Sequence, residues 1–281
     1  MRLPTILARR FVAGETAAEA VEAGTRLQAR KIRATFDLLG EDVATPRQAR
    51  ALSGEIVKLL RAIPAEVERN VSIKLSMLGL DISEDLCLEL AAGVLGVARD
   101  VDGFVRLDME GTKHTDQTLR VFRHLRKDYD NVGIVLQAYL HRSEDDVREC
   151  IERGDRVRLC KGAYREPESL ALQSMPEIRR NFGKCARLLL EGAPYPAIAT
   201  HDEELVTDVI GFTRESGVAA ERFEFQMLYG LRPRRWESLV SAGYNVRVYV
   251  PYGTHWFPYF YRRLRERKEN VWFVVRNVLW G

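Results

Sequence analysis

Short apolar stretches alternate with longer segments of helical character along most of this 281-residue chain. The apolar stretches are rich in β-branched residues, which favours strands, and helix-start residues stand between many of them. Eight strands are predicted in this way, over residues 34–38, 71–77, 103–109, 133–138, 156–161, 197–200, 222–227 and 246–250.

Helix-start chemistry supports the segments between these strands. Thr45 followed by Pro46 predicts an N-cap with proline at the first helical position. The other predicted starts are Ser83, Ser143 with Asp146, Pro176 for a helix over 176–190, and Asp202 for a helix over 203–214.

Regular alternation of strand and helix predicts parallel strands, and eight such units in about 250 residues are typical of a (βα)₈ TIM-type barrel. A doubly wound open sheet is the main alternative, but no predicted strand is followed by G-x-G-x-x-G. No low-complexity segment or long linker divides the chain. We therefore expect one domain over residues 1–281, with a helical N-terminal extension over 1–33 and the barrel over 34–281.

Six of the predicted strands carry polar residues on one face and apolar residues on the other. If the apolar face packs on the helices, the polar face lines the lumen, where charges need partners. An antiparallel sheet with one solvated face would show the same alternation, but the connections here are too long for hairpins. The predicted lumen then holds five cations against two acids, an excess that we expect to meet an anionic ligand: Lys74, Arg106, Arg156, Arg158 and Arg247, against Asp108 and Glu224.

The overall charge says little about function, because 43 basic residues nearly balance 40 acidic ones. That balance argues against a dedicated nucleic-acid binder, which normally has a large basic excess. The four cysteines lack C-x-x-C spacing, so we expect neither a disulfide scaffold nor a metal site. No segment approaches the about 18 continuous apolar residues of a membrane span, and a cytoplasmic setting is the default expectation.

Seven motifs follow one another at the carboxyl ends of predicted strands. Together they resemble the proline dehydrogenase family over about residues 71–269, whereas the first strand, with Asp37, is compatible but less diagnostic. The motifs are VSIKLS at 71–76, VRLDMEGT at 105–112, VLQAYL at 135–140, RLCKGAY at 158–164, ATHD at 199–202, FEFQMLYG at 223–230 and YVPYGTHWFPYFYRRLRER at 249–267.

The resemblance implies a distorted barrel with a C-terminal helix over the active site and non-covalent FAD at its mouth. It implies oxidation of L-proline to Δ1-pyrroline-5-carboxylate, the first step of proline catabolism to glutamate, with electrons passed to a membrane quinone. The type implied is monofunctional and bacterial, with peripheral membrane contact at the inner face of the cell membrane. The sequence leaves the oligomeric state open.

The substrate residues implied by the resemblance come mainly from the last motif. Arg262 and Arg263 would grip the proline carboxylate as two guanidinium forks, and Glu266 lies within one helical turn of both. From spacing alone, this run could equally be a solvated basic helix face. The resemblance adds Lys74 as a third positive charge, and the walls of the ring pocket as Leu228, Tyr249 and Tyr259.

Two residues carry the implied catalytic chemistry. Arg158 resembles the family's arginine near flavin N5, where a positive charge stabilises the reduced flavin. Asp108 resembles the catalytic-site aspartate, as a base or as a positioning residue, and we expect it to pair with Lys74 across the lumen. Further implied FAD contacts are Met109, Gln137, Lys161, Gly162, Ala163, Thr200 and His201.

Two other functions remain open from the residues alone. A Schiff-base aldolase would use Lys74 or Lys161, because lysines at strand ends serve that chemistry. A non-catalytic barrel that binds an amino acid is the second alternative.

Overall fold

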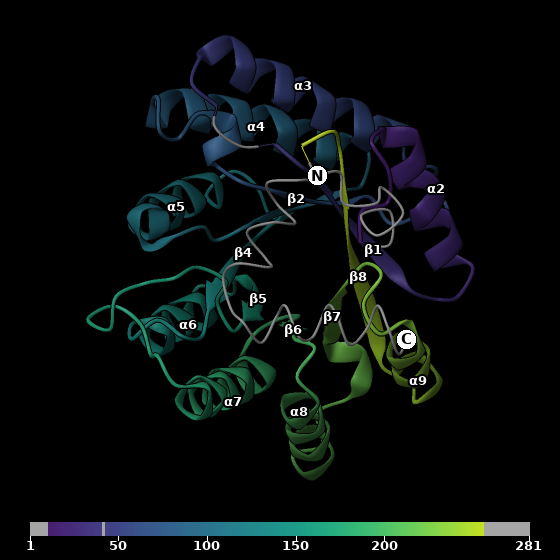
Figure 1. Cartoon of the computed structure of the whole chain (residues 1–281), viewed down its shortest axis with the longest axis vertical. Helices are drawn as coiled ribbons and strands as arrows, with labels where there is room; N and C mark the ends of the chain where they lie inside the picture. Colours follow the sequence, from purple (N-terminus) through teal and green to yellow (C-terminus); the bar gives the residue numbers. More distant parts are fainter. Residues whose placement is uncertain (1–10, 41–42, 256–281) are drawn as a thin grey trace, which may run out of the picture.

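Eight parallel strands close into a barrel in which each strand pairs with its neighbours in sequence and β8 pairs with β1. The structure is a computed structural model that describes residues 11–40 and 43–255. Figure 1 shows helices placed around the strands. The strands are β1 (Arg33–Leu38), β2 (Asn70–Ile73), β3 (Phe104–Leu107), β4 (Val132–Gln137), β5 (Arg156–Cys160), β6 (Ala197–Ala199), β7 (Glu224–Leu228) and β8 (Asn245–Tyr252).

The helices of the described residues follow the strands in regular alternation. Within these ranges, no helix is long and apolar enough to cross a membrane. The helices are α2 (Ala17–Gln28), α3 (Pro46–Ala62), α4 (Glu84–Asp100), α5 (Thr112–Leu125), α6 (Ser143–Glu152), α7 (Met175–Gly192), α8 (Glu203–Glu215) and α9 (Pro233–Ser241), with short 3₁₀ turns η1 (Ser76–Leu78) and η2 (Ala220–Arg222).

All eight predicted strands are present, and the (βα)₈ barrel is confirmed. The second strand ends earlier than the prediction of 71–77, because Met77 and Leu78 donate backbone bonds to Lys74 and Leu75 and form η1. This turn takes the chain out of the sheet directly after Ile73. Lys74 therefore stands at the rim of the barrel and not within a strand.

The predicted helix starts at Thr45 and Ser83 are confirmed. Thr45 forms a capping box with Gln48, in which each side chain satisfies a backbone N–H at the start of α3. The predicted cap at Ser143 is wrong by one residue, because Arg142 occupies the N-cap. The Ser143 hydroxyl instead donates to the carbonyls of Gln137, at the end of β4, and Leu140, in the loop that follows.

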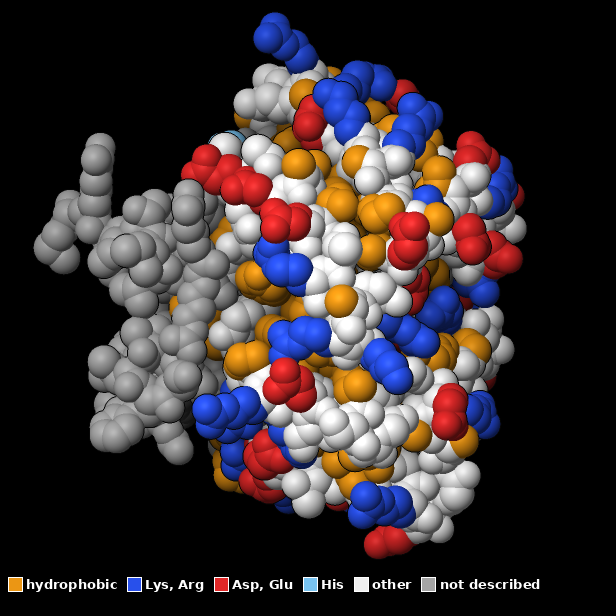
Figure 2. Space-filling view, turned by 90° about the vertical axis from the view of Figure 1, so that its right-hand side faces the viewer, with side chains coloured by type: hydrophobic (Ala, Val, Ile, Leu, Met, Phe, Trp, Pro, Cys, Tyr) orange, Lys and Arg blue, Asp and Glu red, His pale blue; other side chains and the backbone are white. Residues whose placement is uncertain are grey.

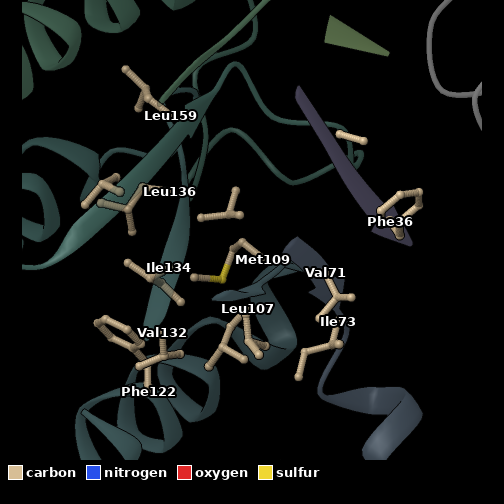
Figure 3. Packing of buried hydrophobic residues seen from close by; sticks show 14 of the residues in the cluster. Phe36, Val71, Ile73, Leu107, Met109, Phe122, Val132, Ile134, Leu136 and Leu159 are labelled. Atoms are coloured by element: carbon tan, nitrogen blue, oxygen red, sulfur yellow. The ribbon is translucent and has the colours of Figure 1, made fainter. Parts of the chain in front are cut away.

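The hydrophobic core lies between the strands and the ring of helices. Figure 3 shows Phe122 of α5 beside Val132 of β4, with Ile134 and Leu136 further along that strand. Ile134 and Leu136 belong to the apolar face of the predicted alternation, and all four side chains are buried. The helices thus cover the apolar face, and the opposite face points into the lumen.

The polar face of the strands is confirmed as the lumen. Arg106, Glu224 and Arg247 are only 1–2% exposed, which excludes an antiparallel sheet with a solvated polar face. On the outer face shown in Figure 2, positive and negative side chains are interspersed. The barrel therefore keeps charge both outside and inside, but the inner charges are removed from water.

Gly133 of β4 makes room for one of the buried cations. A Cβ atom at this position would meet the Nη1 of Arg106 and would lie 2.6 Å from the Arg156 carbonyl oxygen. The Arg106 guanidinium thus occupies the space that a side chain at position 133 would fill.

We expect Gly133→Ala to lower the free energy of unfolding by about 1–3 kcal/mol, because overpacking displaces a buried side chain or the backbone. Urea unfolding measures this change. The matched control is Gly93→Ala in α4, where an added Cβ meets no atom within 4 Å. This second change should raise stability by up to about 1 kcal/mol. If Gly133→Ala leaves the free energy of unfolding unchanged, the position of Arg106 does not depend on this space.

Candidate active site

The predicted site residues of the described chain gather at one end of the barrel. Because the strands are parallel, residues at their carboxyl ends share one rim, which is where barrel enzymes place their active sites. Lys74, Asp108, Lys161 and Thr200 follow β2, β3, β5 and β6 directly, while Gln137 and Leu228 end β4 and β7. Tyr249 lies in β8, and Arg158 lies one layer deeper in β5.

Asp108 and Arg158 form an ion pair at this mouth. The Nη1 of Arg158 donates to Oδ1 of Asp108 at 2.8 Å, and the Tyr249 hydroxyl donates to Oδ2 at 2.7 Å. The Arg158 guanidinium also lies over the Tyr249 ring, 5.4 Å from its centroid. Three predicted residues from β3, β5 and β8 are therefore brought into direct contact.

Lys74 has a nearer partner than the one predicted. Its Nζ lies 2.8 Å from Oδ1 of Asp37 and 3.8 Å from Oδ2 of Asp108. The expected pair with Asp108 exists as the longer contact, and the primary pair is with Asp37, which lies on the neighbouring strand β1. Complete burial raises the pKa of Asp37, and the ammonium of Lys74 opposes that rise.

Arg158 also donates hydrogen bonds from its other nitrogen atoms. Its Nη2 donates to the Ser72 hydroxyl at 3.0 Å, and its Nε donates to the side-chain oxygen of Gln226. The Gln226 amide nitrogen in turn donates to Glu224. Ser72 of β2, Gln226 of β7 and Asp108 just after β3 thus hold the guanidinium from three sides.

The hydrogen-bond network continues to the amino-terminal end of the lumen. Arg247 binds Glu224 through Nε at 2.8 Å and Glu68 through Nη2 at 2.8 Å. Burial alone would raise the pKa of Glu224, but the charge and hydrogen bonds of Arg247 hold it at about 2. Glu224 is therefore a fixed negative charge over the ordinary pH range.

The expected excess of positive charge is not found around Lys74 and Arg158 at the mouth. There, Lys74 and Arg158 face two carboxylates, those of Asp37 and Asp108. The other cations lie deeper: Arg106 donates to the carbonyl oxygens of Ile134 and Arg156, and Arg156 stacks on Phe104 and Tyr195. Burial, together with Arg158 and Arg156, lowers the pKa of Arg106 well below its usual value.

The predicted cofactor residues follow one another along β4, β5 and β6. The Gln137 side chain donates to the Glu110 carbonyl at 2.9 Å and accepts from the Ala163 N–H at 3.4 Å. Gly162, between Lys161 and Ala163, has a φ of +118°, a backbone conformation that favours glycine. This turn brings backbone groups to the rim.

Two charged residues stand beside that turn. The Nζ of Lys161 lies 2.9 Å and the Nε of Arg179 lies 2.8 Å from one oxygen of Asp202. Asp202 also holds the predicted N-cap position of α8, but its side chain binds these cations and not the helix. The Thr200 hydroxyl accepts from the Asp202 N–H, and Nε2 of His201 accepts from the Leu228 N–H at 2.9 Å.

Met109 packs into the hydrophobic cluster, as Figure 3 shows, and is 7% exposed. Tyr259, Arg262, Arg263 and Glu266, together with the predicted C-terminal helix, lie outside the described residues.

Three contributors to the site were not assigned from the sequence. Asp37, Ser72 and Gln226 contact Lys74 or Arg158 directly. Ser72 and Gln226 stand on the polar faces of their strands, and that alternation was the available signal. Asp37 lies next to the last residue of the first strand, which was too ambiguous for the same argument. Within residues 11–40 and 43–255, no group of three or more His, Cys, Asp or Glu side chains could hold a metal ion.

A parallel barrel with paired charges and hydrogen-bond donors at its carboxyl rim has the organisation of a (βα)₈-barrel enzyme. Residues 20–276 match the family described as proline dehydrogenase. The chain belongs to the proline dehydrogenase family, and it is an oxidoreductase of proline catabolism.

Individual relatives agree with this assignment. The chain is 40% identical over 273 residues to proline dehydrogenase 1 of Bacillus subtilis (strain 168), covering 97% of this chain and 90% of the relative. It is 38% identical over 281 residues to the proline dehydrogenase of Deinococcus radiodurans, covering 98% and 91%.

Solved structures share the fold. Proline utilization A (PutA) from Bdellovibrio bacteriovorus, inactivated by N-propargylglycine, superposes with a TM-score of 0.86 at 27% identity. The match covers 99% of this chain and 34% of that one, so this chain spans about a third of the larger protein. PutA from Corynebacterium freiburgense, at 24% identity and a TM-score of 0.81, supports the fold; that match covers 97% of this chain and 32% of the other.

The Glu224–Arg247 pair predicts a specific acid sensitivity. The folded-state pKa of Glu224 is depressed from 4.5 to about 2, so its stabilisation is present above pH 4.5 and is lost as the pH falls towards 2. We expect this group to contribute about 3 kcal/mol to the fall in unfolding free energy over that range. Urea unfolding of Glu224→Gln should lack this component, and the variant should be less stable at pH 7.

The matched control is Glu191→Gln, which changes an exposed carboxylate at the end of α7. This control should keep the pH dependence of the unmodified protein. A Glu224→Gln variant with that same dependence would contradict the role of the buried pair.

Proposed function

We propose that this chain oxidises L-proline to Δ1-pyrroline-5-carboxylate by hydride transfer to non-covalent FAD, and that the electrons then pass to a membrane quinone. The observation that carries this proposal is the orientation of Arg158, whose guanidinium is held at the mouth by Asp108, Ser72 and Gln226. In a proline dehydrogenase, a fixed cation at this position suits a cofactor that gains negative charge on reduction.

The residues along β4 to β6 fit a flavin nucleotide. The Gln137 amide and the backbone around Gly162 would face the ring system, where hydrogen-bond donors are needed. Lys161 and Arg179 supply positive charge for a diphosphate, close to Thr200 and His201 at the end of β6. Met109 would contribute through packing beneath this region, since it lies in the core.

When bound, FAD would supply the hydride acceptor, and the protein would supply charge and position. Arg158 would stabilise the developing negative charge. Both oxygens of Asp108 accept hydrogen bonds, one from Arg158 and one from Tyr249, so we assign Asp108 the role of orienting these two groups. It would act as a positioning residue and not as a proton acceptor.

The substrate would lie above this layer. Lys74 brings a cation to the rim, and Tyr249 and Leu228 bring ring walls from β8 and β7. Arg262 and Arg263, supported by Glu266, would bind the carboxylate, and Tyr259 would complete the ring pocket. A cytoplasmic location stays a prediction. Peripheral contact with the membrane also stays a prediction, because the enzyme would have to reach a membrane quinone.

The aldolase alternative is disfavoured by the surroundings of both candidate lysines. Lys74 lies 2.8 Å from Asp37, and Lys161 lies 2.9 Å from Asp202. A carboxylate at that distance stabilises the protonated amine, whereas Schiff-base formation needs the neutral amine. A non-catalytic role is disfavoured by membership of an enzyme family.

The central prediction is a yellow protein whose flavin absorbance bleaches anaerobically when L-proline is added. Arg158→Met should retain bound flavin, but proline should reduce that flavin at least about 100-fold more slowly. Removing one electrostatic stabiliser typically costs about 10²–10³ in rate. Anaerobic stopped-flow absorbance measures the reduction rate.

Arg148→Met, on the surface of α6, is the matched control, and its flavin should be reduced by proline at the original rate. A folded protein that binds no flavin would refute the proposed function. If the flavin of Arg158→Met is reduced at the original rate, Arg158 does not stabilise the reduced flavin and its proposed role is wrong.

The carboxylate clamp makes a separate prediction. We expect Arg262→Ala to raise KM for proline at least about tenfold, because a charge-assisted hydrogen bond contributes about 1.5–3 kcal/mol. Steady-state kinetics with a dye acceptor measure KM. The affinity for a cyclic carboxylate inhibitor should fall in parallel, whereas the affinity for the same ring without its carboxylate should not. An unchanged KM would contradict this role.

A further inference from the structure

The side chain of Gln226 lies between Arg158 and a buried carboxylate. Its amide nitrogen donates to Oε1 of Glu224, and its oxygen accepts from Nε of Arg158. A carboxylate accepts hydrogen bonds and cannot donate them. Glu224 therefore determines which end of the Gln226 amide faces Arg158, and that end is the oxygen.

Glu224 is itself held in place by the lower layer of the lumen. Arg247 contacts both of its oxygens, at 2.8 Å and 3.1 Å. Arg247 also donates to the Ala34 carbonyl and to Glu68, so its guanidinium is anchored in turn. Glu224, Gln226 and Arg247 are 2%, 4% and 1% exposed, which leaves little water to replace any of these bonds.

We propose that Gln226 and Glu224 are positioning residues that hold the Arg158 guanidinium in one orientation and connect it to the Glu224–Arg247 ion pair at the other end of the barrel. This proposal rests on the proposed function, because it assigns a purpose to the orientation of Arg158. Neither residue touches the substrate, and both act through Arg158.

The three acceptors of Arg158 have different roles in this arrangement. Asp108 and Ser72 contact the two terminal nitrogens, whereas Gln226 contacts Nε, the nitrogen next to the aliphatic stem. A planar group held at its ends and at its stem cannot tilt. Without the acceptor at position 226, the Asp108 ion pair remains, but the plane of the guanidinium is no longer fixed and Nε–H loses its buried partner.

The test is Gln226→Leu, compared with the unmodified protein and with Arg158→Met. We expect Gln226→Leu to lower the two-electron midpoint potential of the bound flavin by about 30 mV, which is a tenfold loss in the reduction equilibrium. Spectroelectrochemical titration measures this potential. Reduction of the flavin by proline should slow about tenfold, with a smaller change in KM.

A second measurement follows the orientation directly and needs no flavin chemistry. In protein labelled with ¹⁵N-arginine, the Arg158 Nε–Hε signal should exchange slowly with water, because it is buried and bonded. In Gln226→Leu this protection should fall at least about tenfold. If the leucine variant does not fold, Gln226→Met keeps the length of the side chain and undergoes both measurements.

The matched control is Asn131→Leu, which removes an amide that bonds to the carbonyls of Leu95 and Gly103, away from Arg158. It should lower stability and leave the flavin potential unchanged. An equal potential shift in this control would attribute the effect to general destabilisation and overturn the proposal.

The outcomes separate this proposal from the proposed function. If Arg158→Met lowers the potential and slows reduction while Gln226→Leu does neither, the positioning role is wrong and the proposed function stands. If Arg158→Met has no effect on either quantity, the proposed role of Arg158 fails, and the positioning role fails with it.

Discussion

Charges inside a closed barrel must find partners inside the same barrel, and the interior of this protein is organised around that requirement. Glu224 and Arg247 are both almost fully removed from water, and their contact is the deepest ion pair of the described chain. Removing either partner would lower the free energy of unfolding by about 3–5 kcal/mol, because the remaining charge would stay buried without its partner. The polar network above this pair therefore starts from the Glu224 carboxylate, which Arg247 holds in place.

From that pair upward, each layer restricts the next. Glu224 orients Gln226, Gln226 holds the stem of Arg158, and Arg158 binds Asp108 at the mouth. The mouth therefore receives one cation that three protein side chains hold in place. Such preorganisation matters for a charge-stabilising group, because a side chain that has to reorient during the reaction loses part of its effect.

The strand pattern was predictable because it depends on local chemistry. Alternation along β2, β3 and β7 identified which side chains face the lumen, and the Thr45 capping box marked the start of α3. The Ser143 cap failed for a tertiary reason. Its hydroxyl binds the carbonyl groups of Gln137, at the end of β4, and of Leu140, in the loop after it, and these acceptors come within reach only when the loop is folded.

The sequence by itself determined the barrel, the inward-facing polar faces of six strands, and the placement of Lys74, Asp108 and Lys161 at the carboxyl rim. Only the tertiary structure decided which of those residues pair. Lys74 binds Asp37 more closely than Asp108, and the surplus cations Arg106 and Arg156 lie on backbone carbonyls and aromatic rings, deep in the lumen. Strand periodicity predicts whether a side chain faces the lumen or the helices. Partner choice depends on distances of about 3 Å across the barrel, which follow from strand register and from the space left by residues such as Gly133.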